Sequence, residues 1–251
     1  MSDNRSKSRL GRRGFFKKLA AGAAAVASVV AAPAGARATM PKGVPRYGML
    51  IDLRRCYGCH ACSVACKAEF DVPLGATRSW VEYAEKGTYP DVRRSFLPRL
   101  CNQCNHPPCV SVCPTDATWK REEDGIVVVD PDICIGCKYC IQACPYDARF
   151  LNPVTGVADK CDFCLHRVSK GVEPACVEAC PAGARIFGDL NDPNSEISRR
   201  IASNPVTVLR PGQGTEPNVF YIDLDHTDEH DVVHRNQYAR VTTHRQQEAR
   251  R

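Results

Sequence analysis

The sequence has few aromatic residues, and beyond residue 38 it has no apolar run long enough to cross a membrane. Phe, Trp and Tyr make up 7% of its 251 residues, so the aromatic platforms on which nucleic-acid bases stack are not evident. A membrane-spanning helix needs about 20 apolar residues, which no run in residues 39–251 provides. The patterns G-x-S-x-G, H-E-x-x-H, G-x-x-x-x-G-K and G-x-G-x-x-G are missing too. We therefore expect no catalytic residue and no enzyme activity of the chain on its own.

Positive charge is concentrated at the N-terminus. The whole chain carries +6, but residues 1–38 alone carry +7, from eight Lys or Arg and one Asp, so residues 39–251 are formally −1. The basic balance therefore gives no evidence for nucleic acid as a partner.

Residues 1–38 resemble a Tat export signal. The twin arginine at positions 12–17, which read RRGFFK, precedes Leu19–Ala32, an alanine-rich apolar stretch too short to span a bilayer. Ala36 and Ala38 supply small residues for cleavage, and an uncleaved membrane anchor is the alternative. We expect a periplasmic protein that is exported in the folded state.

Sixteen cysteines fall into four motifs of four, with none left over. The first and third motifs read C-x2-C-x2-C-x3-C, the second C-x2-C-x4-C-x3-C and the fourth C-x2-C-x11-C-x3-C. This spacing is typical of 4Fe-4S clusters, in which the fourth cysteine of a motif ligates a different cluster. Because one such cluster takes four thiolates, the sequence predicts four 4Fe-4S clusters. The motifs are Cys56, Cys59, Cys62, Cys66; Cys101, Cys104, Cys109, Cys113; Cys134, Cys137, Cys140, Cys144; and Cys161, Cys164, Cys176, Cys180.

Disulfides and zinc are the alternatives. The even cysteine count and the export signal favour disulfides, but 251 residues exceed what a disulfide scaffold needs, and disulfides have no reason to repeat one spacing. Structural zinc sites use two C-x2-C pairs rather than a run of three cysteines plus a fourth. Export by Tat fits clusters, because they are inserted in the reducing cytoplasm before a folded chain crosses. His60, His106 and His166 lie inside the motifs, and we expect them to bond to sulfur or contact a partner.

An internal repeat predicts the fold class. Residues 51–59 match residues 129–137, each an apolar strand, an aspartate, a turn and two cysteines, and Cys113, Cys144 and Cys180 are each followed by proline. We expect an α+β fold of two ferredoxin-like modules, each for two 4Fe-4S clusters, in a pseudo-twofold arrangement with little regular secondary structure. This domain should cover residues 39–225, after the signal at 1–38 and before a polar tail at 226–251.

Few strands are predicted within the domain. We expect strands at Tyr47–Asp52 and Ala184–Phe187, and a hairpin of Thr118–Lys120 with Ile126–Asp130. Val219–Asp223 alternates like an edge strand. Residues 70–100 read as an insertion of mixed character and residues 189–218 as loop, because turn signals recur in the latter. Lys67 rather than proline follows Cys66, so that helix should continue to Glu69.

Three segments, Arg46–Cys56, Pro98–Cys104 and Cys144–Phe150, resemble the four-cluster ferredoxin subunits of molybdopterin oxidoreductases. That family includes subunits of dimethyl sulfoxide, polysulfide, tetrathionate and nitrate reductases, and the likeness is strongest to the electron-transfer subunit of tetrathionate reductase. Nitrate-reductase-like members replace one cysteine by tryptophan and hold a three-iron cluster, whereas all sixteen positions are cysteine here.

The resemblance implies that motifs one and four interlock, as do motifs two and three. The implied ligand sets are Cys56, Cys59, Cys62, Cys180; Cys66, Cys161, Cys164, Cys176; Cys101, Cys104, Cys109, Cys144; and Cys113, Cys134, Cys137, Cys140.

The resemblance also implies a relay of single electrons between a membrane quinol-oxidising anchor subunit and a molybdopterin catalytic subunit, in anaerobic respiration with tetrathionate or a related sulfur compound. Such a protein would be peripheral to the membrane through its partner. A free-standing periplasmic ferredoxin carrier and the iron–sulfur subunit of a sulfite-reduction-associated transmembrane complex are the alternatives. The residues give neither the terminal substrate nor the direction of electron flow.

Overall fold

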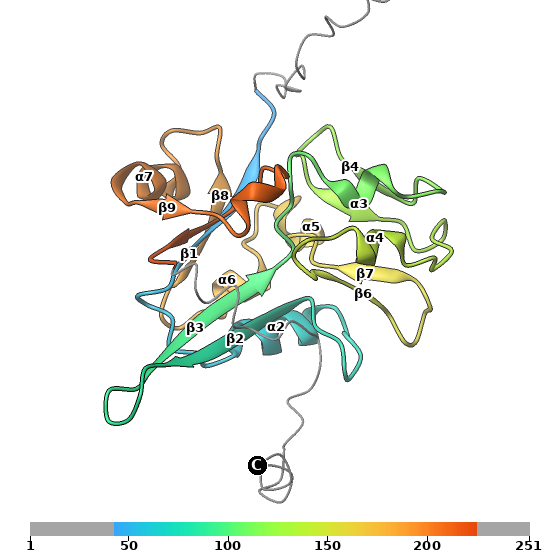
Figure 1. Ribbon diagram of the computed structural model, residues 1–251. Helices are drawn as coiled ribbons and strands as arrows, with labels where there is room; N and C mark the ends of the chain where they lie inside the picture. Colours follow the sequence, from blue (N-terminus) through green and yellow to red (C-terminus); the bar gives the residue numbers. More distant parts are fainter. Residues whose placement is uncertain (1–42, 225–251) are drawn as a thin grey trace, which may run out of the picture. The chain divides into compact units, whose positions relative to one another are not determined.

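The computed structural model describes residues 43–224 (Figure 1). They belong to a single compact unit that begins at Met40. The predicted export signal at 1–38 and the predicted tail at 226–251 lie outside the described residues. No helix within residues 43–224 has the length and apolar character that crossing a membrane requires.

Regular structure is sparse, as the sequence predicts, and the elements are short. The strands are β1 (Tyr47–Asp52), β2 (Ser79–Lys86), β3 (Arg93–Leu100), β4 (Thr118–Lys120), β5 (Val127–Val129), β6 (Arg149–Leu151), β7 (Ala158–Lys160), β8 (Arg185–Asp189), β9 (Val206–Thr207) and β10 (Val219–Ile222). The helices are α2 (Ala61–Glu69), α3 (Pro108–Ser111), α4 (Tyr139–Gln142), α5 (Leu165–Val168), α6 (Ala175–Glu178) and α7 (Glu196–Ser203), with a 3-10 turn at Pro211–Gln213.

A four-stranded sheet of order β8-β1-β10-β9 joins the two ends of the described residues. Strand β1 pairs with β10 in parallel and with β8 antiparallel. Met49, Leu50 and Ile51 are fully buried, because both faces of β1 are covered. The predicted strand at Val219–Asp223 is therefore present, but its assignment to an edge is wrong, since β10 lies between β1 and β9.

Helix α7 packs against this sheet and falls in the segment predicted to be loop. Ser195 caps its N-terminus by accepting a hydrogen bond from the Ser198 amide at 3.2 Å, a common way of satisfying a free helix N–H. Its fully buried Ile197 contacts Leu50 and Ile186 from the sheet. The helix exists because this apolar contact outweighs the turn-rich local sequence.

Three antiparallel hairpins complete the fold (Figure 1). Strands β4 and β5 form the hairpin that the sequence predicts, and β6 and β7 form another. The region predicted as a mixed insertion holds the longest hairpin, in which Ser79 pairs with Leu100 and the register continues to Lys86 and Arg93. Figure 1 shows β4, β6 and β7 together with α3 and α4, away from α7.

The cysteine loops depend on left-handed backbone. Gly58 and Gly136 have φ of +73° and +66°. A Cβ at Gly58 would lie 2.3 Å from the Phe96 ring, and one at Gly136 2.4 Å from the Gly156 carbonyl oxygen. Both positions therefore need glycine for conformation and for space. Helix α2 runs to Glu69, as predicted from the absence of a proline after Cys66.

Candidate metal centres

The sixteen cysteines gather in four places, each of which takes three cysteines from one motif and the last cysteine of another. Three cavities are each lined by four cysteines. We name them site 1 (Cys56, Cys59, Cys62, Cys180), site 3 (Cys101, Cys104, Cys109, Cys144) and site 4 (Cys113, Cys134, Cys137, Cys140). These are three of the four sets that the resemblance implies.

The remaining cysteines form site 2 (Cys66, Cys161, Cys164, Cys176), which mutual electrostatic effects identify. Burial raises the pKa of the Cys66 thiol to about 12, and the neighbouring Cys176 and Cys164 add to the effect. Burial likewise raises the pKa of Cys161 well above its usual value, with further contributions from Cys66 and Cys176. The four thiols therefore lie close to one another in a site from which water is excluded.

The last two cysteines of every motif are four residues apart, and they always belong to different sites. Cys62 and Cys66 lie one turn apart on α2, a rise of about 6 Å, and they point into sites 1 and 2. The second, third and fourth motifs repeat this division across α3, α4 and α6. Helix α2 packs against α6, and α3 against α4, so each packed pair of helices holds two sites next to each other.

Backbone amides donate hydrogen bonds to several of these sulfurs. The Ala158 amide lies 3.5 Å from Cys134 Sγ, the Phe163 amide 3.4 Å from Cys161 Sγ and the Ala184 amide 3.3 Å from Cys180 Sγ. Such bonds stabilise negative charge on sulfur and are one of the means by which a protein sets the potential of an iron–sulfur cluster.

Two arginines that sequence reasoning misses lie among the cysteines. Arg149 and Arg185 each follow the last cysteine of a motif by five residues, in the repeated pattern Cys-Pro-x-x-Ala-Arg, which is the signal that could have identified them. Both are 3% exposed. Among residues 43–224, Arg149 Nε and Nη1 are buried without a hydrogen-bond partner. A buried cation with idle donors beside four thiols fits an anionic cluster, so the residues present suit the predicted group.

The four sites are in series. Cys62 of site 1 lies on α2 and Cys176 of site 2 on α6, and these two helices pack together. Gln103, between Cys101 and Cys104 of site 3, donates from Nε2 to the carbonyl oxygen of Cys161 in site 2 at 2.8 Å. Arg149 lines both site 3 and site 4. The order along the molecule is therefore site 1, site 2, site 3, site 4.

Exposure divides the series into ends and middle. Cys59 of site 1 and Cys137 of site 4 are exposed, whereas all four cysteines of site 2 are buried and those of site 3 are buried or half-buried. Within the described residues no three His, Cys, Asp or Glu side chains converge on a single ion-sized point; the sulfurs of sites 1, 3 and 4 stand instead around cavities.

Two of the three motif histidines lie beside carboxylates. His166 Nε2 lies 2.7 Å from Glu69 Oε1, and His106 Nε2 lies 3.6 Å from Glu216 Oε2. His60 lines site 1 and has left-handed backbone, at the start of α2. His166 thus bonds to Glu69, and the expectation that the motif histidines bond to sulfur or contact a partner stays a prediction.

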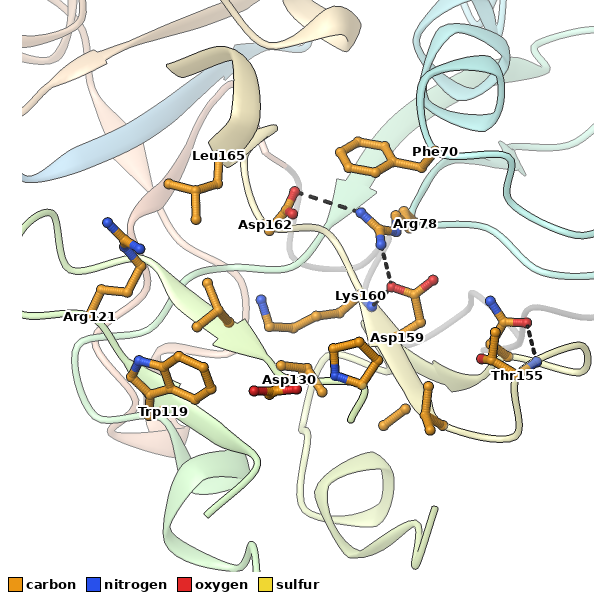
Figure 2. A pocket seen from close by; sticks show the side chains of 16 residues that line it. Phe70, Arg78, Trp119, Arg121, Asp130, Thr155, Asp159, Lys160, Asp162 and Leu165 are labelled. Carbon is orange, nitrogen blue, oxygen red and sulfur yellow. Dashed lines mark hydrogen bonds and ion pairs between the residues drawn. The ribbon is translucent and has the colours of Figure 1, made fainter. Parts of the chain in front are cut away.

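A further cavity of about 560 Å³ has no cysteine among the residues that line it (Figure 2). Figure 2 shows Arg78 between Asp159 and Asp162, with nitrogen–oxygen distances of 2.6 and 3.7 Å. The Arg78 guanidinium also lies 3.9 Å from the centre of the Phe70 ring. These contacts connect the segment that precedes β2 with β7 and the residues that follow it.

Comparison with known proteins gives the class. Two family models, each described as a 4Fe-4S dicluster domain, match residues 55–118 and 92–190. The fold and the cysteine sites are thus those of a ferredoxin-like iron–sulfur protein with two dicluster domains, as the sequence predicts.

Relatives then give the family. A tetrathionate reductase subunit of Salmonella typhimurium is 54% identical over 184 residues, covering 72% of this chain and 73% of the relative. Protein NrfC of Escherichia coli is 48% identical over 179 residues, 70% of this chain and 80% of the relative. A polysulfide reductase subunit of Wolinella succinogenes is 46% identical over 182 residues, which cover 70% of this chain and 94% of the relative. The protein belongs to the family of iron–sulfur subunits that includes these relatives, which confirms the resemblance found in the sequence.

Proposed function

We propose that the chain is the electron-transfer subunit of a reductase complex, and that sites 1 to 4 each hold one 4Fe-4S cluster ligated by their four cysteines. When bound, each cluster supplies a carrier for one electron. The observation that carries the proposal is the serial order of the sites, with exposed cysteines, among the described residues, only in the terminal sites 1 and 4. A relay needs this arrangement, because electrons must enter and leave at the surface while the middle stays shielded.

The residues around the sites act by ligation, exclusion of water and hydrogen bonding. Sixteen thiolates would ligate the irons, and the buried walls of sites 2 and 3 keep water from the sulfurs. The amide bonds to Cys134, Cys161 and Cys180 stabilise charge on these ligands. A pseudo-twofold relation between the two modules, within a domain at residues 39–225, is part of the proposal and is supported by the repeated motifs.

The proposed partners are a molybdopterin catalytic subunit and a polytopic membrane anchor that oxidises quinol, in a reductase of tetrathionate or a related sulfur compound. The names of two relatives, subunits of a tetrathionate reductase and of a polysulfide reductase, support a reductase of a sulfur compound with more than one subunit. Both terminal sites have large exposed apolar side chains beside their exposed cysteine, Tyr57 at site 1 and Ile135 and Tyr139 at site 4. Such side chains favour contacts with other subunits.

We further propose a periplasmic location after export in the folded state, peripheral to the membrane through the anchor. The test replaces Arg12 and Arg13 by lysine. The protein should then remain in the cytoplasm with its iron, whereas unchanged periplasmic recovery would contradict the export signal.

The main test is anaerobic purification of the full chain with its complex. We expect about sixteen irons per chain and co-purification of a molybdenum-containing subunit. Cys137→Ser should abolish quinol-driven turnover, because it removes a ligand at a terminal site, and Val172→Ser, an exposed position in the loop before α6, is the control. Normal turnover of Cys137→Ser would refute the relay. Isolation of an iron-loaded chain without partners would favour a free-standing carrier instead.

A further inference from the structure

Three buried cations alternate with the four sites. Arg185 lies between sites 1 and 2, Lys160 between sites 2 and 3, and Arg149 between sites 3 and 4. Each of the three side chains belongs to a residue that is only 3% exposed. Burial of a cation is unfavourable unless an anion compensates its charge, so the groups around each cation indicate its role.

Arg149 connects sites 3 and 4. Its Nη2 donates to Cys109 Sγ at 3.0 Å and to Thr118 Oγ1 at 2.9 Å. Burial lowers the pKa of Arg149, but Cys109 and Cys101 of site 3 and Cys140 of site 4 raise it, and the net direction is upward. The guanidinium therefore stays charged, and it faces thiols of both sites.

Arg185 occupies the corresponding place between sites 1 and 2. Its Nη1 donates to Cys176 Sγ at 3.7 Å, and its Nη2 donates to Ser79 Oγ at 3.0 Å. It also lines the cavity of site 1. Burial lowers the pKa of Arg185, whereas Cys176 and Cys62 raise it, and the net direction is upward. A hydroxyl thus orients each arginine, Ser79 at the start of β2 and Thr118 at the start of β4.

Lys160 fills the middle junction. Figure 2 shows its side chain reaching from β7 toward the neighbouring hairpin. Its Nζ donates to the carbonyl oxygen of Val127 and, at 2.9 Å, to that of Cys161 in site 2. Val127 is one of the residues that line the cavity of site 3. The ammonium is therefore held against site 2 and against the wall of site 3.

We infer that Arg185, Lys160 and Arg149 are positioning residues that each set the reduction potentials of the two clusters beside them; this inference rests on the proposed function. A four-thiolate cubane is already anionic, and reduction adds one electron and no proton. A fixed cation in a low-dielectric site favours the reduced form of both neighbours. It also offsets the repulsion that an electron on one cluster exerts on the next.

The test is a redox titration of the anaerobically purified full chain in its complex, followed by electron paramagnetic resonance. In Arg149→Met, Arg185→Met and Lys160→Met, two of the four potentials should fall, each by at least a tenfold change in the one-electron equilibrium, which is about 59 mV. Arg149→Met and Arg185→Met should shift different pairs of potentials, and Lys160→Met should shift one potential from each pair. This pattern needs no prior assignment of signals to sites.

Charge and mere structure are separated by two controls. Arg149→Lys and Arg185→Lys keep the positive charge, so the potentials of the two neighbouring clusters should change by less than about 59 mV, a tenfold change in the one-electron equilibrium. Thr118→Val removes a hydrogen bond of Arg149 but not its charge, so it should also shift the potentials of the clusters in sites 3 and 4 by less than that. The inference would be overturned if the three variants with methionine kept full iron and four unshifted potentials. It would also be overturned if Arg149→Lys and Arg185→Lys shifted the potentials as much as Arg149→Met and Arg185→Met do.

Iron content distinguishes the inference from the proposed function. Absence of clusters from the wild-type chain would end both, whereas intact clusters with unshifted potentials would end only the inference. If all three variants with methionine lose their clusters, Arg149→Lys and Arg185→Lys decide. The inference requires that these two variants keep both their iron and their potentials, and loss of iron from them would overturn it.

Discussion

Alanine at Gly136 should destabilise the protein in a way that no second side-chain change can repair, whereas alanine at Gly58 should be repairable. Both positions have positive φ, which costs a residue with a Cβ about 1–2 kcal/mol. The new Cβ would also overlap a neighbour, and overpacking typically costs about 1–3 kcal/mol. Each single variant should therefore lose about 2–5 kcal/mol, and the difference between them lies in what the Cβ meets.

At Gly58 the obstacle is the Phe96 ring, 2.3 Å away, and at Gly136 it is the backbone carbonyl of Gly156, 2.4 Å away. Removal of the ring in Phe96→Ala should relieve the overlap at Gly58 but not at Gly136. The double variant Gly58→Ala/Phe96→Ala should thus be more stable than the sum of its single changes by about 1–3 kcal/mol. Gly136→Ala/Phe96→Ala should be additive, which makes it the matched control.

The assay is the rate at which anaerobic protein loses its visible cluster absorbance at a fixed temperature, because cluster loss makes unfolding irreversible. A loss of 1.4 kcal/mol corresponds to about a tenfold faster rate, so both single glycine variants should exceed that. Equal coupling of Phe96→Ala to both glycine variants, or none to either, would refute the assignment of the overlaps.

Three other substitutions test a buried ion pair, a titrating carboxylate and the crossed ligation. Arg99 Nη1 lies 3.0 Å from both carboxylate oxygens of Glu82. Glu82→Leu removes this carboxylate from a buried cation, so it should lower the free energy of unfolding by about 3–5 kcal/mol, measured by thermal unfolding. Glu82→Leu/Arg99→Leu should cost much less, and equal costs would contradict the pairing. Hydrogen bonds from Arg54 lower the pKa of Asp52 below its ordinary 3.8, so this stabilisation is present above that pH and is lost as pH falls through the lower folded-state value. The stability gap between wild type and Asp52→Asn should accordingly narrow in acid, and a constant gap would rule the linkage out. Cys180→Ala should remove about four irons although the first motif is intact, and unchanged iron would show that the motifs do not interlock.

The parts of the fold that local sequence determines could be predicted. Strand β1 has the predicted bounds. Helix α2 continues past Cys66 to Glu69, as predicted from the lysine that stands there in place of a proline. The β2–β3 hairpin escaped prediction because Pro98 interrupts the pattern of β3, and a proline normally argues against a strand. Helix α7 escaped because its stability comes from Ile197 in contact with the sheet, and that contact is not visible in the local sequence.

The candidate site divides in the same way. Spacing identifies the sixteen cysteines, and the resemblance implies which of them share a cluster. The aromatic neighbours could not be placed: Tyr57 and Tyr139 are more than half exposed while Phe163 is buried, although all three adjoin cysteines in sequence. Arg149 and Arg185 could be found only once their burial between two sites was known, because an arginine in a short strand usually faces solvent.

The interlocking of distant motifs imposes an order on biosynthesis. Sites 3 and 4 draw all their cysteines from residues 101–144, whereas sites 1 and 2 need residues 161–180, and the sheet beside them closes only when β10 pairs with β1. With the ligation proposed above, the two central cysteine motifs could fold around their irons while the ribosome is still making the chain. The first motif must wait, with its thiols open to the cytoplasm, until the fourth has emerged. Iron delivery should therefore begin in the middle of the polypeptide and finish at its N-terminal end.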